Sequence, residues 1–420
     1  MSDAPLTNWA GNYTYRAARF HQPATLAELQ ALVARCRRVR AVGTRHSFNS
    51  LPDCAEDLVS LERLPPRLTL DHAQQTVTVS AAVRYGELAQ ALHAQGYALH
   101  NLASLPHLSV AGAVATGTHG SGSRHGNLAT AVRALVLMTA EGDVRRLAPE
   151  TDGELFNGAV VALGALGIVT ELTLAVEPTF AVAQDVYEGL PLEAALAHFD
   201  ELVDSAYSVS LFTDWRGPRI NQVWVKRRVG VDHAAPPDLR LGAARATRER
   251  HPLPDHSAEN CTPQLGAPGP WHERLPHFRL EYTPSNGAEL QSEYLLPRRH
   301  AAAALQALAG LSAQIAPHLH ISEIRTVAAD ELWLSPSYAQ ASVCLHFTWR
   351  PDWPAVSALL PVIEARLAPF GARPHWGKLF TLPPAQLRPL YPRLPDFQRL
   401  AARLDPAGKF RNAFVDAYLF

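Results

Sequence analysis

The sequence predicts an α+β fold with two domains, the first of which is assembled from both ends of the chain. Its 420 residues are enough for two domains of ordinary size, each with a substantial core. Helical and strand-like patterns both recur along the chain, and its texture changes after Pro178 and again near residue 376. We therefore expect a first domain over residues 1–176, a second over 177–376, and a C-terminal segment, 377–420, that returns to the first.

Composition and charge indicate an ordinary globular protein, with 47% apolar residues and no repeats. The formal net charge is −1, so no overall field attracts nucleic acid or an anionic membrane. The first residues, MSDAPLTNWAGN, lack the basic and apolar regions of a signal peptide. The longest apolar stretch, 159–169, is broken by two glycines and is too short to span a bilayer. We expect a cytoplasmic monomer with neither nucleic acid nor membrane as a partner.

Cysteine usage is typical of a reducing compartment. The four cysteines are scattered, without a CxxC pair: Cys36, Cys54, Cys261 and Cys344. Such spacing supports neither a disulfide scaffold nor a structural zinc site. We predict no bound metal.

The first hundred residues predict two helices and two strands. Thr25 and Glu28 form a capping box that opens an amphipathic helix, with Leu26, Leu29 and Leu32 facing inward. The other elements expected here are a strand at 39–42, a strand at 76–81, and a helix from residue 84 that stops at Gly96.

Segment 104–122, SLPHLSVAGAVATGTHGSG, is dense in glycine, serine, threonine and histidine. No ordinary helix or strand tolerates that mix, so we expect an irregular backbone in close contact with another group. A β-hairpin should follow over 131–148, with its turn at 141–143, and a glycine turn should run into a strand over 164–174.

The middle of the chain predicts a second set of strands and helices. These are a helix at 191–206, strands at 208–216, 221–228, 320–327 and 341–349, and a long helix that starts at Pro297. Between Gly230 and Gly287 the sequence is rich in Pro, Ala, Arg and His, and we interpret it as irregular.

Several familiar motifs are absent. Segment 104–122 matches neither a P-loop nor a clear G-x-G-x-x-G, and the spacing in 371–378 is wrong for a P-loop. His272, Glu273 and His277 have the wrong spacing for a zinc protease, and Pro276 interrupts the helix that such a motif requires. No G-x-S-x-G occurs either. For segment 104–122 we favour a backbone whose N–H groups lie along a pyrophosphate over a purely structural glycine turn.

His46 lies in the loop GTRHSFN, residues 43–49. Alone it would be interpreted as a half-exposed loop histidine. Its combination with segment 104–122 and with GALGIVTELTL resembles the vanillyl-alcohol-oxidase type of FAD-binding domain. Further motifs, found almost to the end of the chain, resemble the bacterial alditol oxidase branch of the sugar-1,4-lactone oxidase family: GPWHERLPHF, GAELQSEY, EIRTVAAD, WLSP, HFTW and RPHWGK.

The resemblance implies an FAD-binding domain formed by 1–176 and 377–420, and between them a substrate domain built on an antiparallel sheet flanked by helices. It also implies that His46 is joined covalently to the flavin. The cofactor-binding residues that it implies are Ala41, Val42, Gly43, Thr44, Arg45, His46, Ser47, Ser104, Ser109, Gly112, Thr116, Gly117, Thr118, His119, Ile168, Val169 and His375.

Strand periodicity groups a second set of polar residues. Glu323 and Arg325 are two apart on a predicted strand, so they face the same way roughly 6.5–7 Å apart, and His346 and Thr348 do so on the next strand. Lys378 follows in a loop. A salt-bridged sheet surface would explain any single pair. The resemblance favours a substrate pocket with Glu323, Arg325 and Lys378 as catalytic residues and with Ser104, His346 and Thr348 beside them.

The function that the resemblance implies is oxidation of the terminal hydroxyl of an alditol such as xylitol or sorbitol to the aldose. FAD would accept the hydride, and O2 would be reduced to H2O2. Two alternatives stay open: a sugar-1,4-lactone oxidase or dehydrogenase on the same scaffold, and a non-catalytic FAD-binding protein. The triad Glu323, Arg325 and Lys378 argues against the latter, because a binding protein does not need it.

Overall fold

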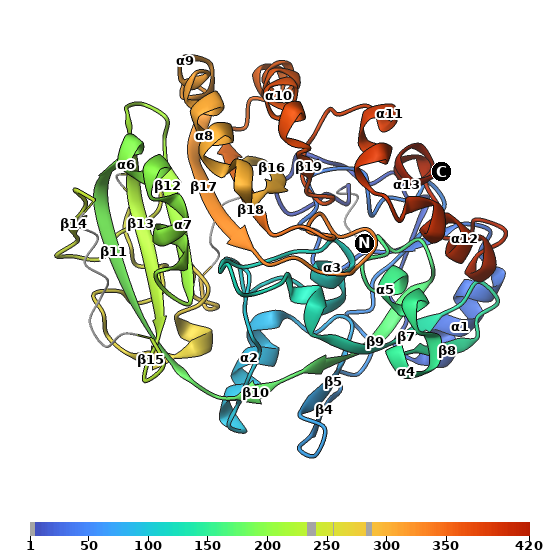
Figure 1. Cartoon of the computed structure of the whole chain (residues 1–420). Helices are drawn as coiled ribbons and strands as arrows, with labels where there is room; N and C mark the ends of the chain where they lie inside the picture. Colours follow the sequence, from blue (N-terminus) through green and yellow to red (C-terminus); the bar gives the residue numbers. More distant parts are fainter. Residues whose placement is uncertain (1–4, 233–240, 255, 283–287) are drawn as a thin grey trace.

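A nine-stranded sheet, a five-stranded sheet and a small parallel sheet carry the fold of this computed structural model, which describes residues 5–232, 241–254, 256–282 and 288–420. The nine-stranded sheet lies on one side of the molecule, and the five-stranded sheet lies on the other (Figure 1). This mixture of helices and mainly antiparallel strands confirms the predicted α+β class.

The parallel sheet positions the first loop of the site. Its strand order is β1 (Arg19–His21), β3 (Asp57–Val59) and β2 (Val39–Ala41). Buried Asp57 joins two residues of β1 to the central strand, because its Oδ1 lies 2.6 Å from Arg19 Nε and 2.7 Å from His21 Nε2. Strand β2 matches the predicted strand and runs directly into the loop that carries His46.

Helix α1 (Leu26–Arg35) begins with the predicted cap. Thr25 Oγ1 accepts a hydrogen bond from the N–H of Glu28, whose carboxylate accepts one from the backbone before the helix. Leu29 and Leu32 are buried, whereas Leu26 is 47% exposed. The inward orientation predicted for Leu26 is therefore wrong, because this first-turn residue lies outside the cluster into which the later turns pack.

The five-stranded sheet is antiparallel. In spatial order its strands are β4 (Leu68–Asp71), β5 (Thr76–Ser80), β9 (Ile168–Ala175), β7 (Val132–Met138) and β8 (Val144–Leu147). The predicted hairpin is confirmed: Gly142 has φ +91°, and Thr139 donates to Asp143 across the turn. Strand β9 follows a glycine turn, as expected, and buries every second residue.

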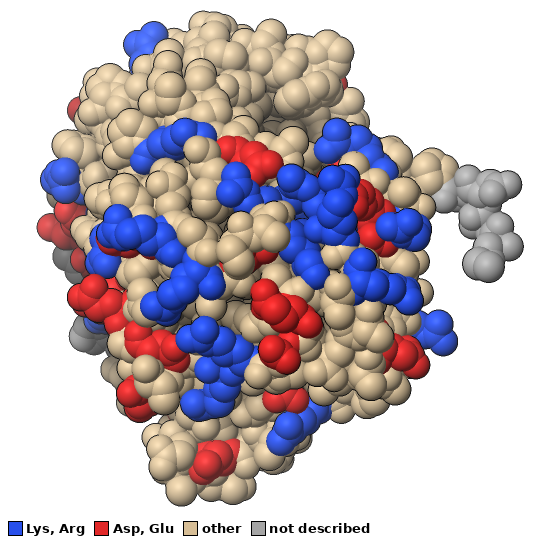
Figure 2. All heavy atoms as spheres, turned by 90° about the vertical axis from the view of Figure 1, so that its right-hand side faces the viewer, with Lys and Arg blue, Asp and Glu red and all other residues tan. Residues whose placement is uncertain are grey.

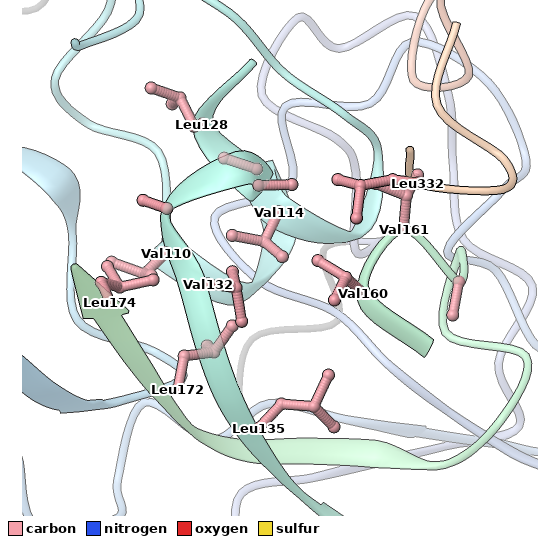
Figure 3. Close-up of a cluster of buried hydrophobic side chains, with 14 of the residues drawn as sticks. Val110, Val114, Leu128, Val132, Leu135, Val160, Val161, Leu172, Leu174 and Leu332 are labelled. Atoms are coloured by element: carbon pink, nitrogen blue, oxygen red, sulfur yellow. The ribbon is translucent and has the colours of Figure 1, made fainter. Parts of the chain in front are cut away.

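Short helices accompany this sheet: α2 (Tyr85–Ala94), α3 (Val110–Ala115), α4 (Pro149–Asp152) and α5 (Glu154–Val160). Figure 3 shows the core between α3, β7 and β9, where Val110 and Val114 point toward the sheet. The prediction that segment 104–122 has no regular structure is wrong for residues 110–115. Their valine and alanine side chains gain more from burial in one helical turn than Gly112 costs.

The nine-stranded sheet carries the other wall of the site. In spatial order its strands are β14 (Ala244–Arg245), β11 (Ala181–Pro191), β13 (Arg219–Arg228), β12 (Ser208–Thr213), β17 (Leu319–Val327), β18 (Ser342–Trp349), β16 (Leu290–Pro297) and β19 (Arg373–Pro374), and β15 (Gly269–Pro270) pairs with β11. A separate two-stranded pair joins β6 (Tyr97–Ala98), which follows α2, to β10 (Glu177–Pro178), which lies between β9 and β11 in the chain.

Helices cover one face of this sheet: α6 (Leu192–Ala197), α7 (Phe199–Asp204), α8 (Ala301–Ala309), α9 (Ser312–Ile315) and α10 (Trp353–Leu367). Ile324 and Leu345 join the apolar cluster beneath them. Because side chains alternate along a strand, Glu323, Arg325 and His346 must lie on the opposite face.

Two helix predictions in this region need correction. The helix predicted over 191–206 is two helices, because the chain leaves helical geometry at His198. The long helix predicted from Pro297 starts later, at Ala301, since Pro297 pairs with Ser342 as the last residue of β16. Of the segment 230–287, predicted irregular, residues 233–240, 255 and 283–287 lie outside the described part of the chain, and the rest holds only short strands and one turn of 3-10 helix.

The C-terminal segment, with α11 (Pro384–Leu387), α12 (Leu394–Leu404) and α13 (Ala413–Leu419), returns to the first half of the chain, where α12 packs against α5 (Figure 1). The side-chain amide of Asn412 donates to the carbonyls of Ser50, Leu51 and Asp53. Buried Arg40 of β2 donates to the carbonyl of Phe410. The boundaries at 177 and 376 themselves stay predictions.

Basic and acidic side chains are interspersed on the face shown in Figure 2. Several arginines of the protein are ion-paired, including Arg145 with Asp152 and Arg411 with Asp416.

All four cysteines are buried, and none forms a disulfide within the described residues. Within the described ranges, no helix has the length and apolar character needed to cross a bilayer.

Candidate active site

A cavity of about 710 Å³ lies between two walls from distant parts of the chain. We call residues 41–48 together with 103–119 the loop wall, and strands β16, β17 and β18 with residues 375–378 the sheet wall. All the predicted site residues except two line this cavity: Ala41, Val42, Gly43, Thr44, Arg45, His46, Ser47, Ser104, Ser109, Gly112, Thr116, Thr118, His119, Val169, Glu323, Arg325, His346, Thr348, His375 and Lys378.

Gly117 and Ile168 do not line the cavity. A Cβ added to Gly117 would meet Pro336 and Val161, so this glycine serves a turn with φ +65°. Ile168 pairs with Met138 and is buried in an apolar cluster on the far side of β9, because alternation along the strand turns Val169 to the cavity instead. The assignment of these two residues to the cofactor therefore lacks structural support.

The loop wall presents unused main-chain donors. Val42 N–H completes the parallel pairing with Val59, but the next five amides, of residues 43 to 47, have no acceptor within the described residues. A Cβ at Gly43 would lie 2.2 Å from Ser109 Oγ, so a larger residue here would displace that hydroxyl. Consecutive free N–H groups on a cavity wall are a typical cradle for phosphate oxygens. This donor set fits the pyrophosphate of FAD.

His46 is held in place on this wall. Its Nδ1 lies 3.1 Å from Thr44 Oγ1, and its ring stacks on Trp9 with centroids 5.1 Å apart. Arg45 adopts φ +62°, and its carbonyl accepts the N–H of Trp9, which fixes the stacked pair. Burial, helped by His107, lowers the pKa of His46 to about 4, so its imidazole is neutral at pH 7 and keeps a nitrogen lone pair.

The sheet wall owes its composition to strand register. His346 of β18 pairs with Glu323 of β17 on one side and with Glu293 of β16 on the other. Three titratable side chains therefore stand in one row across the sheet, on the face that looks into the cavity. Thr348 follows two residues after His346 on the same face, and Arg325 two residues after Glu323.

Glu293 is the residue that sequence reasoning missed. Its Oε1 accepts a hydrogen bond from Arg325 Nη2, and its Oε2 one from Lys378 Nζ, both at 2.7 Å. His119 Nε2 lies 3.3 Å from Oε1. Burial would raise the pKa of Glu293, but Lys378 and Arg325 outweigh burial and hold it well below its usual range. A lone glutamate in the apolar run LQSEYLLP was the available signal.

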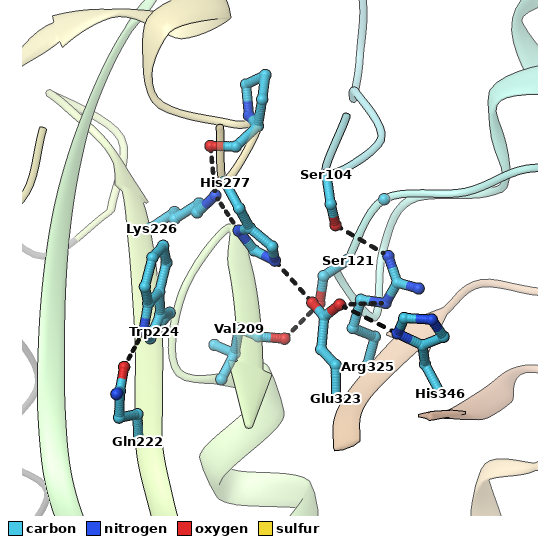
Figure 4. Close-up of polar contacts among 12 residues, drawn as sticks. Ser104, Ser121, Val209, Gln222, Trp224, Lys226, His277, Glu323, Arg325 and His346 are labelled. Carbon is cyan, nitrogen blue, oxygen red and sulfur yellow. Dashed lines mark hydrogen bonds and ion pairs between the residues drawn. The ribbon is translucent and has the colours of Figure 1, made fainter. Parts of the chain in front are cut away.

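Glu323 has a different set of partners (Figure 4). His277 Nε2 lies 2.7 Å from its Oε1, and Arg325 Nε lies 3.6 Å from its Oε2. Burial would raise the pKa of Glu323, but Arg325 and His277 keep it below its usual range. His277, rejected above as a zinc ligand, thus belongs to this cluster, whereas His272 packs against His93.

The arrangement leaves donors free for a ligand. Arg325 Nε and His346 Nε2 are buried without a hydrogen-bond partner among the described residues. Arg325 Nη1 reaches Ser104 Oγ at 3.3 Å (Figure 4), which ties the two walls together. Lys378 uses one of its three N–H groups on Glu293. Unpaired buried polar groups are costly, so a ligand rich in hydroxyls suits this wall.

The comparisons with known proteins agree with this geometry. Residues 17–148 match a family model described as an FAD binding domain, and residues 287–418 match one described as D-arabinono-1,4-lactone oxidase. Cholesterol oxidase from B. sterolicum has a similar structure, with a TM-score of 0.79 and 14% identity over 99% of this chain and 96% of that one. At that identity the similarity shows the fold alone, and it confirms the predicted FAD-binding fold.

Curated relatives are more specific. An alditol oxidase from a Streptomyces species is 53% identical over 99% of both chains. The L-gulonolactone oxidase of Bos taurus is 26% identical over 98% of both chains. On this similarity the chain belongs to the alditol oxidase family of FAD-dependent oxidoreductases.

Proposed function

We propose that this chain oxidises the terminal primary hydroxyl of an open-chain alditol such as xylitol or sorbitol, with FAD as the hydride acceptor and O2 as the final oxidant. The observation that supports it best is the sheet wall. There Arg325 and Lys378 retain free donors, His346 keeps an unpaired ring nitrogen among the described residues, and two ionised carboxylates sit between them. The 53% identical relative bears the name alditol oxidase. The proposal assigns residues 1–176 and 377–420 to FAD and 177–376 to the substrate.

Bound FAD would supply the two-electron acceptor, and the protein would bind and orient the substrate and stabilise the developing charge. Lys378 and Arg325 place positive charge beside the reacting hydroxyl and favour the alkoxide character that develops as the hydride leaves. Glu323 offers Oε2 to substrate hydroxyls, while Thr348, His346 and Ser104 orient them. Glu293 keeps the two cations together without becoming protonated, because its pKa is held so low.

We further propose that His46 carries the flavin covalently. A neutral imidazole in a cavity wall, fixed by Thr44 and Trp9, is a competent nitrogen nucleophile. Purified protein should remain yellow after denaturation and precipitation. His46→Ala should still bind FAD but release it into the supernatant, and release of all flavin from the unaltered protein would exclude the bond.

Substrate preference tests the proposed reaction. Xylitol and sorbitol should consume O2 and form H2O2, whereas propanol should be far poorer, because it leaves buried groups unpaired at about 1–3 kcal/mol each. The second candidate is sugar-1,4-lactone oxidation, which the lactone oxidase match over 287–418 favours. Rapid oxidation of L-gulono-1,4-lactone with no response to xylitol would establish that alternative.

We also propose that the protein is a cytoplasmic monomer. Size-exclusion chromatography can check the oligomeric state.

A further inference from the structure

A buried lysine stands behind Glu323, outside the cavity. Lys226 comes from β13, two strands away from Glu323 in the sheet. Its Nζ contacts three acceptors: the carbonyl of Leu275, the carbonyl of Pro276 at 3.2 Å and His277 Nδ1 at 3.1 Å. An ammonium group has three N–H donors and no lone pair, so the three acceptors use all of its donors.

This contact fixes the proton on His277. Because Lys226 can only donate, Nδ1 of His277 must accept, and the ring proton therefore resides on Nε2. Nε2 lies 2.7 Å from Glu323 Oε1 and donates to it. Phe212 and Trp224 pack edge-on against the ring, with centroids 5.5 and 5.1 Å away, which keeps the ring from turning out of line (Figure 4 shows Trp224).

The choice of lysine is informative. The chain has only three lysines, Lys226, Lys378 and Lys409, among 38 basic residues, and two of them serve this site. A compact ammonium can satisfy three acceptors in a small buried space, which a planar guanidinium cannot. Lys226 is buried and does not line the cavity.

We propose that Lys226 is a positioning residue for alditol oxidation: through His277 it fixes Glu323 as an oriented carboxylate whose Oε2 stays free for a substrate hydroxyl. The proposal rests on the proposed function for its substrate, but the tautomer of His277 can be tested without turnover. The arrangement resembles the way a buried partner sets the tautomer of a catalytic or metal-bound histidine.

The charge state of Lys226 should then control substrate binding. Burial lowers the pKa of Lys226 to about 7, although Glu323 opposes the shift, and Cys261 and Arg325 are the other titratable groups that face it. As the pH rises past this value, the group loses its charge and one N–H, so two donors remain for three acceptors and the hydrogen bond that holds His277 Nδ1 weakens. The KM for xylitol should therefore rise with pH through the neutral range, with a smaller change in kcat.

The test replaces Lys226 by Met, which keeps the side-chain length and removes the donors. In the holoenzyme, KM for xylitol at pH 6.5 should rise about tenfold or more, the loss expected for one hydrogen bond to a charged group, with kcat much less affected. The rise in KM with pH through the neutral range, which we call the neutral-range step in KM, should disappear. Lys409→Met is the matched control, because Lys409 also donates to two backbone carbonyls, of Val33 and Ala140, far from Glu323; it should leave KM and its pH dependence unchanged.

Two variants of His277 separate positioning from simple packing. In His277→Gln the amide oxygen can still accept a hydrogen bond from Lys226 and the amide N–H can still donate one to Glu323. Unlike histidine, glutamine has no proton that can move between two ring nitrogens. This variant should lose much less affinity for xylitol than His277→Phe, which fits the aromatic surroundings and makes neither bond. The neutral-range step in KM should be absent from both. An equal loss in the two variants would overturn the proposal.

A direct readout uses ring-15N histidine in the holoenzyme, with His277→Gln to identify the signal. The unaltered protein at pH 6.5 should show Nε2–H and an unprotonated Nδ1 for His277, and Lys226→Met should lose this pattern. A His277 signal that Lys226→Met leaves unchanged would overturn the proposal. If the unaltered enzyme ignored xylitol but the spectra behaved as expected, the proposed substrate would fail while the role of Lys226 in fixing His277 would stand.

Discussion

The loop wall presents main-chain groups from one short stretch of sequence, whereas the sheet wall presents charged side chains from strands far apart in the chain. Residues 43–47 offer five consecutive amides without an acceptor in the described part of the chain. On the other wall, Glu293, Glu323 and Arg325 meet only through the pairing of β16, β18 and β17. A backbone cradle depends on local conformation and tolerates many side chains, but an ion-paired cluster depends on each side chain. We therefore expect the loop wall to govern flavin content and the sheet wall to govern turnover.

The largest effect is expected from Lys378→Met. Removing the cation beside the reacting hydroxyl should reduce kcat with xylitol about 10²–10³-fold, as with loss of one transition-state donor elsewhere. Flavin absorbance per protein should not change, since Lys378 lies on the sheet wall. Loss of flavin together with activity would break the distinction between the walls.

Glu293→Gln should act on the same wall through its neighbours. The amide keeps the size of Glu293 but leaves Arg325 and Lys378 without their shared anion. Breaking a buried ion pair costs about 3–5 kcal/mol, so the thermal midpoint should fall clearly and kcat/KM should fall with it. Glu171→Gln is the control, because Glu171 pairs with Arg67 on the five-stranded sheet and does not line the cavity. A Glu293→Gln enzyme as stable and active as the unaltered protein would contradict the assigned role.

Gly43→Ala tests the loop wall against Gly117→Ala. The added Cβ at Gly43 would lie 2.2 Å from Ser109 Oγ on the cavity surface, so flavin content should fall. Gly117 has φ +65° but faces Pro336 and Val161, away from the cavity, and its substitution should cost stability by about 1 kcal/mol without a loss of flavin. The flavin-to-protein ratio of each variant measures the loss of flavin, and its thermal unfolding measures the loss of stability. Equal flavin loss in both would restore Gly117 to the cofactor site.

The last prediction concerns the effect of acid on stability. Burial lowers the pKa of His375 on the sheet wall to about 3, against an unfolded value near 6.5. Between these pH values the unfolded state binds the extra proton, so the stabilising contribution is complete above pH 6.5 and is lost as the pH falls toward 3. His375→Asn keeps an acceptor for the N–H of Gly377 but does not titrate. In His375→Asn, the free energy of unfolding, measured with denaturant from pH 7 to 4, should depend less steeply on pH, by at most about 1.4 kcal/mol per pH unit. An unchanged dependence on pH would count against a neutral His375.

The sequence determined those features whose signals are local. The capping box at Thr25, the hairpin turn at Gly142 and the strands 320–327 and 341–349 follow from neighbouring residues, because caps, turns and strand alternation act over a few positions. The GTRHSFN loop, segment 104–122 and GALGIVTELTL indicated the FAD-binding domain, and the later motifs such as EIRTVAAD and RPHWGK indicated the family. The same-face relation of Glu323 and Arg325 was readable as a spacing of two.

Only the tertiary structure decided which distant groups meet. Strand periodicity could not show that Glu293 would balance Arg325 and Lys378, because that pairing depends on the order β17, β18, β16 in the sheet. Nor could it place Lys226 behind His277, since their contact joins a strand to a loop 51 residues later. Gly117 and Ile168 were assigned to the cavity from their motifs, but turn geometry and strand alternation direct them elsewhere. A buried charge is tolerated only when an opposite charge lies beside it. The register of the sheet decides which side chains become neighbours, and no local sequence pattern encodes that register.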